Sequence, residues 1–289
     1  MINTPYRVPF DGTFRVADAP TAPPPDAPGK KDARRQLKAL VKELSDLQRI
    51  LYAHDHHAVL LVFQAMDAAG KDGTIRAVLS GVNPAGCMVS SFKKPSSEEL
   101  EHDFLWRTAR RLPERGMIGV FNRSYYEEVL VVRVHPAYLR SQRLHEQADL
   151  DTIWTERFDS IRQHEQHLQR NGTLVLKFWL NVSHEEQRQR FLSRLNEPEK
   201  NWKFSVGDVE ERQHWPTYMA AYEDALNATS RPWAPWYAIP ADNKAYMRLQ
   251  VAQIVVAHLR GLDLRYPSVQ PKDRARFDEM RALLEKEGG

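Results

Sequence analysis

Cysteine and long apolar runs are almost missing from this sequence. Cys87 is the only cysteine among 289 residues, which excludes an intramolecular disulfide and gives no sign of a thiol metal site. The longest strongly apolar runs, 59–63 and 174–180, fall far short of the roughly 18–20 residues that a helix needs to cross a bilayer. The N-terminal region has no apolar signal core. We therefore expect no membrane association and a cytoplasmic location.

A strong excess of either charge is also lacking. The formal net charge is only +3, so any site for a polyanion must come from local clustering of basic residues. Together with the lack of a sequence-reading motif, this argues against a nucleic-acid-binding protein. The eleven histidines show no ligand spacing beside a carboxylate, so we expect no histidine-based mechanism. A hydrophobic fraction of 42% and a charged fraction of 27% are typical of an ordinary globular protein.

The chain does contain a regular alternation of predicted strands and helices. Short apolar runs predict strands at 59–64, 87–92, 117–122, 174–180 and 236–240. Helical patterns run from Asp32 to about residue 51, from about Thr74, and over 97–111, 125–134, 149–169, 183–195, 209–228 and 244–262. This alternation predicts an α/β fold whose parallel sheet is covered by helices on both faces. We expect the proline-rich residues 1–28 to form an extended arm or a mobile tail, and 266–289 to form a peripheral charged segment.

A candidate phosphate loop, residues 65–74, lies between the first predicted strand and the next helix. Such a loop offers backbone N–H groups to phosphate at a helix N-terminus, and the candidates here are Ala68, Ala69, Gly70, Asp72 and Gly73. Lys71 would reach phosphate oxygens as a mobile cation that is exposed until the substrate arrives. Asp67 and Asp72 would repel one another among phosphates without a divalent cation, so we infer Mg²⁺ here. The alternative is a tight strand-to-helix turn whose lysine is solvated.

The predicted strand at 117–122 ends in a second polar segment. In an open parallel sheet, ligands bind at the carboxyl ends of the strands, so Arg123 would point toward the phosphates that Lys71 holds. The alternative is that Asn122 and Ser124 only cap a helix.

Five motifs follow one another along the chain. They are 66–73 (MDAAGKDG), 91–95 with 102–107, 121–126 (FNRSYY), 197–205 (EPEKNWKFS) and 239–244 (IPADNK). In this order, over residues 30–262, they resemble the polyphosphate kinase 2 family. The resemblance implies a thymidylate-kinase-like, three-layer α/β/α P-loop kinase fold, with a phosphotransferase domain at 29–265 and a helical lid at about 183–210. It also implies Mg²⁺, or alternatively Mn²⁺, the substrates inorganic polyphosphate and AMP, ADP or ATP, and a homo-oligomer, either a dimer or a tetramer.

The resemblance also implies roles for individual residues. Asp67 resembles the catalytic aspartate that positions the metal and the acceptor phosphate. Lys71 resembles the phosphate-loop lysine, and Arg123 the arginine of the second motif. Asn122 stands where many members have aspartate, so two alternatives stay open: its oxygen ligates the metal directly, or it accepts a hydrogen bond from a metal-bound water.

Basic residues of the implied lid form a further group of candidates. Arg190 and Arg194 would neutralise charge on the transferring phosphoryl group, in the manner of an arginine finger. The alternative is that this helix has an ordinary solvated face. Further phosphate contacts are expected from Lys93, Lys94, Lys200 and Lys203.

Glu127 directly follows the R-S-Y-Y motif. The resemblance implies that family members with asparagine at this position act on ADP. Members with glutamate at this position resemble the subgroup that phosphorylates AMP as well as ADP. A carboxylate at this place would hold a second metal ion or a metal-bound water. The alternative is that Glu127 and Glu128 only favour the first turn of a helix. We therefore expect reversible, direct in-line conversion of AMP to ADP and ADP to ATP, with an NTP-dependent small-molecule kinase on the same fold as the alternative.

Overall fold

The computed structural model describes residues 4–144, 149 and 152–287. Its centre is a sheet of parallel strands in the order β2-β3-β1-β4-β5. The strands are β1 (Ala58–Gln64), β2 (Cys87–Ser91), β3 (Ile118–Asn122), β4 (Thr173–Asn181) and β5 (Trp236–Pro240). Each lies where the sequence predicted a strand. Every residue of β1 is buried, as expected for the central strand of a sheet that is covered on both faces.

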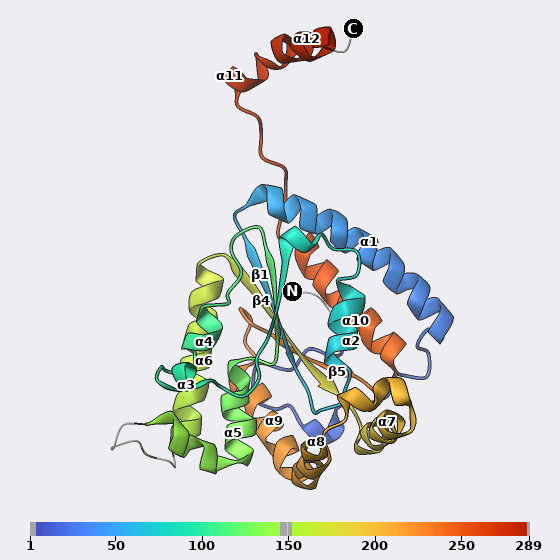
Figure 1. Ribbon diagram of the computed structural model, residues 1–289, viewed down its shortest axis with the longest axis vertical. Coiled ribbons are helices and arrows are strands. Elements are labelled where there is room, and N and C mark those ends of the chain that lie inside the picture. The colour runs from blue at the N-terminus through green and yellow to red at the C-terminus, as the bar shows by residue number, and fades with distance from the viewer. Residues whose placement is uncertain (1–3, 145–148, 150–151, 288–289) are drawn as a thin grey trace.

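Helices cover both faces of the sheet (Figure 1). One side carries α1 (Lys30–His54), α2 (Lys71–Val78) and α10 (Lys244–Arg260). The other side carries α3 (Ser97–Leu100), α4 (Trp106–Ala109), α5 (Val131–Val134), α6 (Ile153–Arg170) and α9 (Trp215–Thr229). Beyond the carboxyl ends of the strands lie α7 (His184–Asn196) and α8 (Val206–Glu210). The predicted three-layer α/β/α arrangement is confirmed.

Several predicted helices are broken in the structure. The stretch 97–111 is split into α3 and α4, 125–134 into a 3-10 turn (Tyr125–Val129) and α5, and 209–228 into α8, a 3-10 turn (Glu211–His214) and α9. The first break follows from Asp103, whose Oδ1 accepts the Leu105 N–H at 2.9 Å and starts a new turn. The last break precedes Pro216, which fits the first turn of α9 and cannot continue a helix from before it. The start of the predicted helix 149–169 includes 150–151, which lie outside the described residues.

The proline-rich segment lies along the body of the protein over its described part, residues 4–28. Tyr6 and Val8 are buried in the main core. The Val8 N–H donates to the Trp236 carbonyl at 2.9 Å, and the Ala238 N–H donates to the Tyr6 carbonyl at 2.8 Å. The segment is thus an extended arm paired with β5, and the mobile-tail alternative does not describe these residues, because their apolar side chains complete the core.

The C-terminal helices stand apart from this body. Figure 1 shows α11 (Pro271–Arg274) and α12 (Phe277–Glu287) projecting from the end of the molecule opposite α7 and α8. Neither helix contributes a buried residue. In the part of the chain that the structure describes, no helix combines the length and apolar character that crossing a membrane requires.

Candidate active site

Two loops meet at the carboxyl edge of the sheet, because β1 and β3 are neighbours in register, with Phe63 opposite Asn122. The loop after β1 turns into α2 at Gly70, whose φ of +106° is a left-handed conformation that glycine adopts without strain. Because Gly70 caps the helix, α2 begins at Lys71, three residues before the predicted start near Thr74. The predicted strand–loop–helix context of a phosphate loop is therefore present.

Lys71 is held inside this loop. Its side chain is 9% exposed, and its Nζ donates to the carbonyl of Ala65 at 2.8 Å and to that of Met66 at 3.5 Å. Burial lowers the pKa of Lys71, and the neighbouring Arg123 guanidinium lowers it further. The expectation of a mobile lysine that is exposed before substrate binds is wrong, because the loop carbonyls already satisfy the ammonium group. The solvated-turn alternative is wrong for the same reason.

Arg123 lies at the end of β3 and links the two loops. Its Nη2 donates to Oδ1 of Asp67 at 2.7 Å, and its Nη1 lies 3.3 Å from Oε2 of Glu127. The carboxylate of Glu127, followed by that of Asp67, raises the pKa of Arg123. Glu127 also accepts a hydrogen bond from Nε2 of Gln64 at 3.0 Å. The result is a chain of charge-assisted contacts from β1 through Glu127 and Arg123 to the phosphate loop.

Asn122 contacts the phosphate loop on its other side. Its Nδ2 donates to Oδ1 of Asp72 at 2.6 Å. An aspartate at position 122 would face Asp72 across this distance and would repel it, whereas the amide donates a hydrogen bond to it. Among the described residues no group of three or more histidine, cysteine, aspartate or glutamate side chains could hold a metal ion. A metal at this edge would therefore depend on Asp67, Asp72 and substrate oxygens.

A cleft of about 610 Å³ opens above the phosphate loop. It is strongly basic: its lysines and arginines are Lys71, Arg76, Lys93, Lys94, Arg123, Arg190, Arg194, Lys200, Lys203, Lys244 and Arg248. Its carboxylates are Asp67 and Asp72, and its other lining residues are Ala68, Gly70, Gly73, Ser91, Phe92, Asn122 and Ser193. Because the net charge of the chain is only +3, a site for a polyanion requires basic residues clustered in one place, and this cleft has such a cluster.

The cleft brings together most of the residues that the sequence singled out. Among them, Ala69 and Glu127 do not line it: Ala69 is buried in the loop, and Glu127 lies behind Arg123. Sequence reasoning missed several lining residues, namely Arg76, Ser91, Phe92, Ser193, Lys244 and Arg248. A signal existed for four of them, because Ser91 and Phe92 open the 91–95 motif, Lys244 ends the 239–244 motif, and Arg248 lies one helical turn further along the same face.

The two arginines of the predicted lid differ sharply. Arg190 is 7% exposed, and its guanidinium donates to the carbonyls of Ala68, Ala69, Ala241 and Asp242 at 3.0, 2.6, 2.6 and 3.2 Å. A fifth contact joins its Nε to Oε1 of Glu186 at 2.7 Å. In this structure Arg190 therefore ties α7 to the phosphate loop and is not a free arginine finger. The solvated-face alternative is also wrong for Arg190, because its backbone partners bury it.

Arg194 lies one turn further along α7 and is more accessible. Its Nη1 donates to the Lys203 carbonyl at 3.0 Å and to Oδ2 of Asp208 at 3.1 Å. Both partners come from the segment after α7, so Arg194 links the two parts of the predicted lid. A solvated face does exist on α7, and Arg188 lies on it: within the described part of the chain, its side chain pairs with Glu185 alone, one turn before it.

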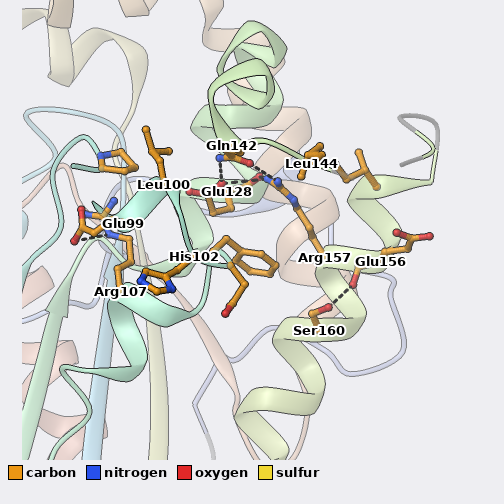
Figure 2. Close-up of a pocket in the computed structure, with 14 residues that line it drawn as sticks. Glu99, Leu100, His102, Arg107, Glu128, Gln142, Leu144, Glu156, Arg157 and Ser160 are labelled. Atoms are coloured by element: carbon orange, nitrogen blue, oxygen red, sulfur yellow. Dashed lines mark hydrogen bonds and ion pairs between the residues drawn. The ribbon is translucent and has the colours of Figure 1, made fainter. Parts of the chain in front are cut away.

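A second, smaller hollow of about 250 Å³ lies beside the cleft, on the face of the sheet that carries α6 (Figure 2). Figure 2 shows Glu128, Gln142 and Arg157 joined on one wall. Burial raises the pKa of Glu128 despite the Arg157 guanidinium at 3.1 Å. Arg107, on the opposite side, donates to the Lys93 carbonyl at 2.7 Å and so connects this hollow to the cleft. The charged lining residues are Glu99, Asp103, Glu128, Glu156, Arg107 and Arg157, an acidic set beside a basic cleft.

The fold and this edge define a P-loop phosphotransferase: a parallel α/β sheet, a glycine-capped phosphate loop with its lysine, and a basic cleft above it. The chain belongs to the polyphosphate kinase 2 family, since the model of the family Polyphosphate kinase 2 (PPK2) matches residues 28–266.

Comparison with individual proteins agrees with this family. An "ADP-polyphosphate phosphotransferase" of Rhodopseudomonas palustris is 55% identical over 92% of this chain and 93% of its own length. An "AMP/ADP-polyphosphate phosphotransferase" of Meiothermus ruber is 46% identical over 91% and 94%. The crystal structure of polyphosphate kinase 2 from Arthrobacter aurescens TC1 superposes with a TM-score of 0.88 at 37% identity, covering 97% of this chain and 95% of that one.

Proposed function

We propose that this chain transfers phosphoryl groups between inorganic polyphosphate and adenine nucleotides, converting AMP to ADP and ADP to ATP in reversible steps. The observation that carries the proposal is the cleft above the phosphate loop, which among the described residues is lined by eleven basic side chains and two carboxylates. Such an excess of positive charge suits two polyanionic substrates held together. The name of the Meiothermus ruber relative supports both steps, and that of the Rhodopseudomonas palustris relative supports the step from ADP.

The proposed reaction is a direct in-line transfer. A terminal phosphate oxygen of the nucleotide forms a bond to the terminal phosphorus of polyphosphate, and the bond from that phosphorus to the rest of the chain breaks. The attacking oxygen is already ionised, so positioning and charge neutralisation supply most of the catalysis and no general base is required. Because one phosphoanhydride bond replaces another, the reaction runs in both directions.

The protein's own groups have distinct roles in this proposal. The loop amides and Lys71 hold the phosphates on the axis of α2, and Arg123 neutralises the charge that develops on the transferring group. Asp67 keeps the Arg123 guanidinium in the cleft through their 2.7 Å contact. Arg194, in the segment over the cleft, is the lid arginine still able to reach the phosphates, since its side chain is 20% exposed.

The carboxylates also fit a divalent metal, proposed to be Mg²⁺, with Mn²⁺ as the alternative. Arg123 and Asn122 occupy the Oδ1 atoms of Asp67 and Asp72, and within the described chain neither Oδ2 has a hydrogen-bond partner. Mg²⁺ commonly binds one or two carboxylates together with substrate phosphates and waters. When bound, the metal would neutralise phosphate charge and align the reacting groups.

The nucleoside is proposed to occupy the hollow of Figure 2. An acidic lining repels phosphates but accepts hydrogen bonds from the hydroxyls of a sugar, and Phe104 gives it an aromatic surface. Arg107 joins this hollow to Lys93 in the cleft, so a nucleotide would extend from one to the other. Assembly as a dimer or tetramer stays a prediction.

An assay with purified protein tests the proposed function. AMP or ADP is incubated with polyphosphate, with Mg²⁺ or with excess EDTA, and the nucleotides are separated by chromatography. We expect ATP from ADP, and ADP followed by ATP from AMP, only with polyphosphate and metal. Phosphorylation of AMP that needs ATP and ignores polyphosphate would refute the proposal in favour of an NTP-dependent kinase.

A further inference from the structure

The basic cleft continues past the phosphate loop into a second groove of about 370 Å³, which we call the α1–α10 groove. It lies between the N-terminal ends of α1 and α10, on the side of the sheet opposite the hollow of Figure 2 (Figure 1). Its lining residues are Lys30, Arg34, Leu37, Glu186, Asp242, Asn243, Lys244, Ala245 and Arg248. Lys244 and Arg248 line the cleft as well, so the two spaces share a wall.

The cations of this groove lack partners, whereas its acids have them. Within the described chain, Arg34, Lys244 and Arg248 make no hydrogen bond or ion pair. Glu186, by contrast, binds Arg190 at 2.7 Å, and Oδ1 of Asp242 accepts the Ser183 N–H at 2.8 Å. The carboxylates of the groove are therefore bonded elsewhere, and within the described chain they form no ion pair with Arg34, Lys244 or Arg248.

The surroundings of Arg248 are the strongest indication that the groove binds an anionic ligand. Its Nε is buried without a hydrogen-bond partner, and its guanidinium lies against Gly73, where even a Cβ would come within 2.9 Å of Nη2. Burial lowers the pKa of Arg248, and Arg76, Arg34 and Arg190 lower it further. Holding unpaired cations together opposes folding, and an anion among them would relieve that repulsion.

The two ends of the cleft therefore have opposite character. One leads to the acidic hollow, which suits a neutral nucleoside, and the other leads to the α1–α10 groove, which suits a longer anion. We propose that the polyphosphate chain leaves the cleft through the α1–α10 groove, where Arg248, Lys244 and Arg34 bind phosphates distant from the reacting end. This inference rests on the proposed function and adds the direction of the donor and a subsite that only long chains fill.

The subsite has a measurable consequence for chain length. Contacts far from the reacting phosphorus strengthen the binding of ground state and transition state alike, so they lower the Kd and the KM without raising kcat. Arg34 lines the α1–α10 groove but not the cleft, so tripolyphosphate held at the phosphate loop should gain less from Arg34 than a chain that continues into the groove. The protein should thus bind long chains more tightly than short ones, and Arg34 should contribute to that difference.

Arg34→Gln tests the inference, with Arg35→Gln as the matched control. Both side chains are exposed on the first turns of α1, but Arg35 pairs with Asp32 and lies outside the groove. Calorimetry would give the Kd of each protein for tripolyphosphate and for long-chain polyphosphate. We expect Arg34→Gln to raise the ratio of the long-chain Kd to the tripolyphosphate Kd about tenfold, the effect of one lost charge contact. Arg35→Gln should leave the ratio unchanged.

An unchanged ratio in Arg34→Gln, or an equal change in Arg35→Gln, would overturn the α1–α10 path. Binding is measured apart from turnover, so this failure is distinct from failure of the proposed function. If wild-type protein binds no polyphosphate of either length, the proposed function itself is wrong. If Arg34→Gln keeps the wild-type preference for long chains, only the proposed path through the α1–α10 groove is wrong.

Discussion

Replacing Arg190 by alanine should weaken the whole phosphate loop. The guanidinium joins α7 to two carbonyls of that loop and to two carbonyls before α10, all within 3.2 Å. These carbonyls come from segments far apart in the chain, so no local structure replaces the lost donors. The substitution would leave several acceptors and the carboxylate of Glu186 with poorer partners in a largely buried place.

The expected magnitude follows from these contacts. Removing a buried charged donor costs about 3–5 kcal/mol, because each acceptor left without a partner costs about 1–3 kcal/mol and relaxation recovers part of the loss. For a protein of this size, about 2 °C of Tm accompanies each kcal/mol, so we expect a fall of about 6–10 °C. The loop amides would also lose their alignment, and kcat should fall at least about tenfold.

Thermal unfolding and steady-state kinetics measure both effects. Arg188→Ala is the control on the same helix, because Arg188 is exposed and pairs only with Glu185, and its Tm should equal that of the wild type. Arg194→Ala should lower kcat with a smaller change in Tm, because its contacts lie in the lid. A wild-type Tm for Arg190→Ala would refute the reasoning, and so would equal effects of Arg190→Ala and Arg188→Ala.

The remaining predictions use single substitutions. Lys71→Met should lower kcat by about 10²–10³, and a variant that kept most of its activity with polyphosphate would contradict the phosphate-loop assignment. Asn122→Asp should lower the Mg²⁺ concentration for half-maximal activity, because a second carboxylate would face Asp72; an unchanged metal titration would speak against this. Glu127→Asn should lower the rate with AMP about tenfold and spare ADP, whereas equal losses would remove the specificity role. Burial lowers the pKa of His258 from 6.5 to about 4. Between these two pH values the unfolded chain binds more protons than the folded one, so the folded state loses stability as the pH is lowered from 6.5 towards 4. The free energy of unfolding should therefore fall by about 3 kcal/mol more in the wild type than in His258→Gln when the pH is lowered from 7 to 4. Parallel pH profiles of the two proteins would disprove this.

Much of the fold could be predicted because its signals are local. Each strand was predicted from a short run between turns, and the phosphate loop lies directly after β1, which is buried throughout. The breaks inside the longer helices could not be predicted from periodicity, since they depend on single side chains such as Asp103 and Pro216. An extended arm was one of the two alternatives for residues 1–28, but its pairing with β5 could not be predicted, because that pairing joins opposite ends of the chain.

The sequence named most of the residues that line the cleft, but not how they are arranged. Arg190 and Arg194 lie one helical turn apart and are equivalent in the sequence, so no pattern along α7 distinguishes them. What separates them is tertiary: carbonyls from the phosphate loop and from the segment before α10 surround Arg190, and Asp208 binds Arg194. Burial of Lys71 has the same origin, since its partners are carbonyls whose direction follows from the fold of the loop.

Arg123 shows how the fold maintains an unfavourable backbone at this site. Its φ of +62° is left-handed, which for a residue with a side chain costs about 1–2 kcal/mol. The residues after it anchor the turn, because the hydroxyls of Tyr125 and Tyr126 both donate to Oε1 of the buried Glu165 at 2.9 Å. Lys177 completes that cluster at 2.6 Å from Glu165, in the middle of β4. A buried charged cluster behind the sheet edge thus opposes the strain, and it directs Arg123 between Asp67 and Glu127, where the proposed transfer requires a fixed cation.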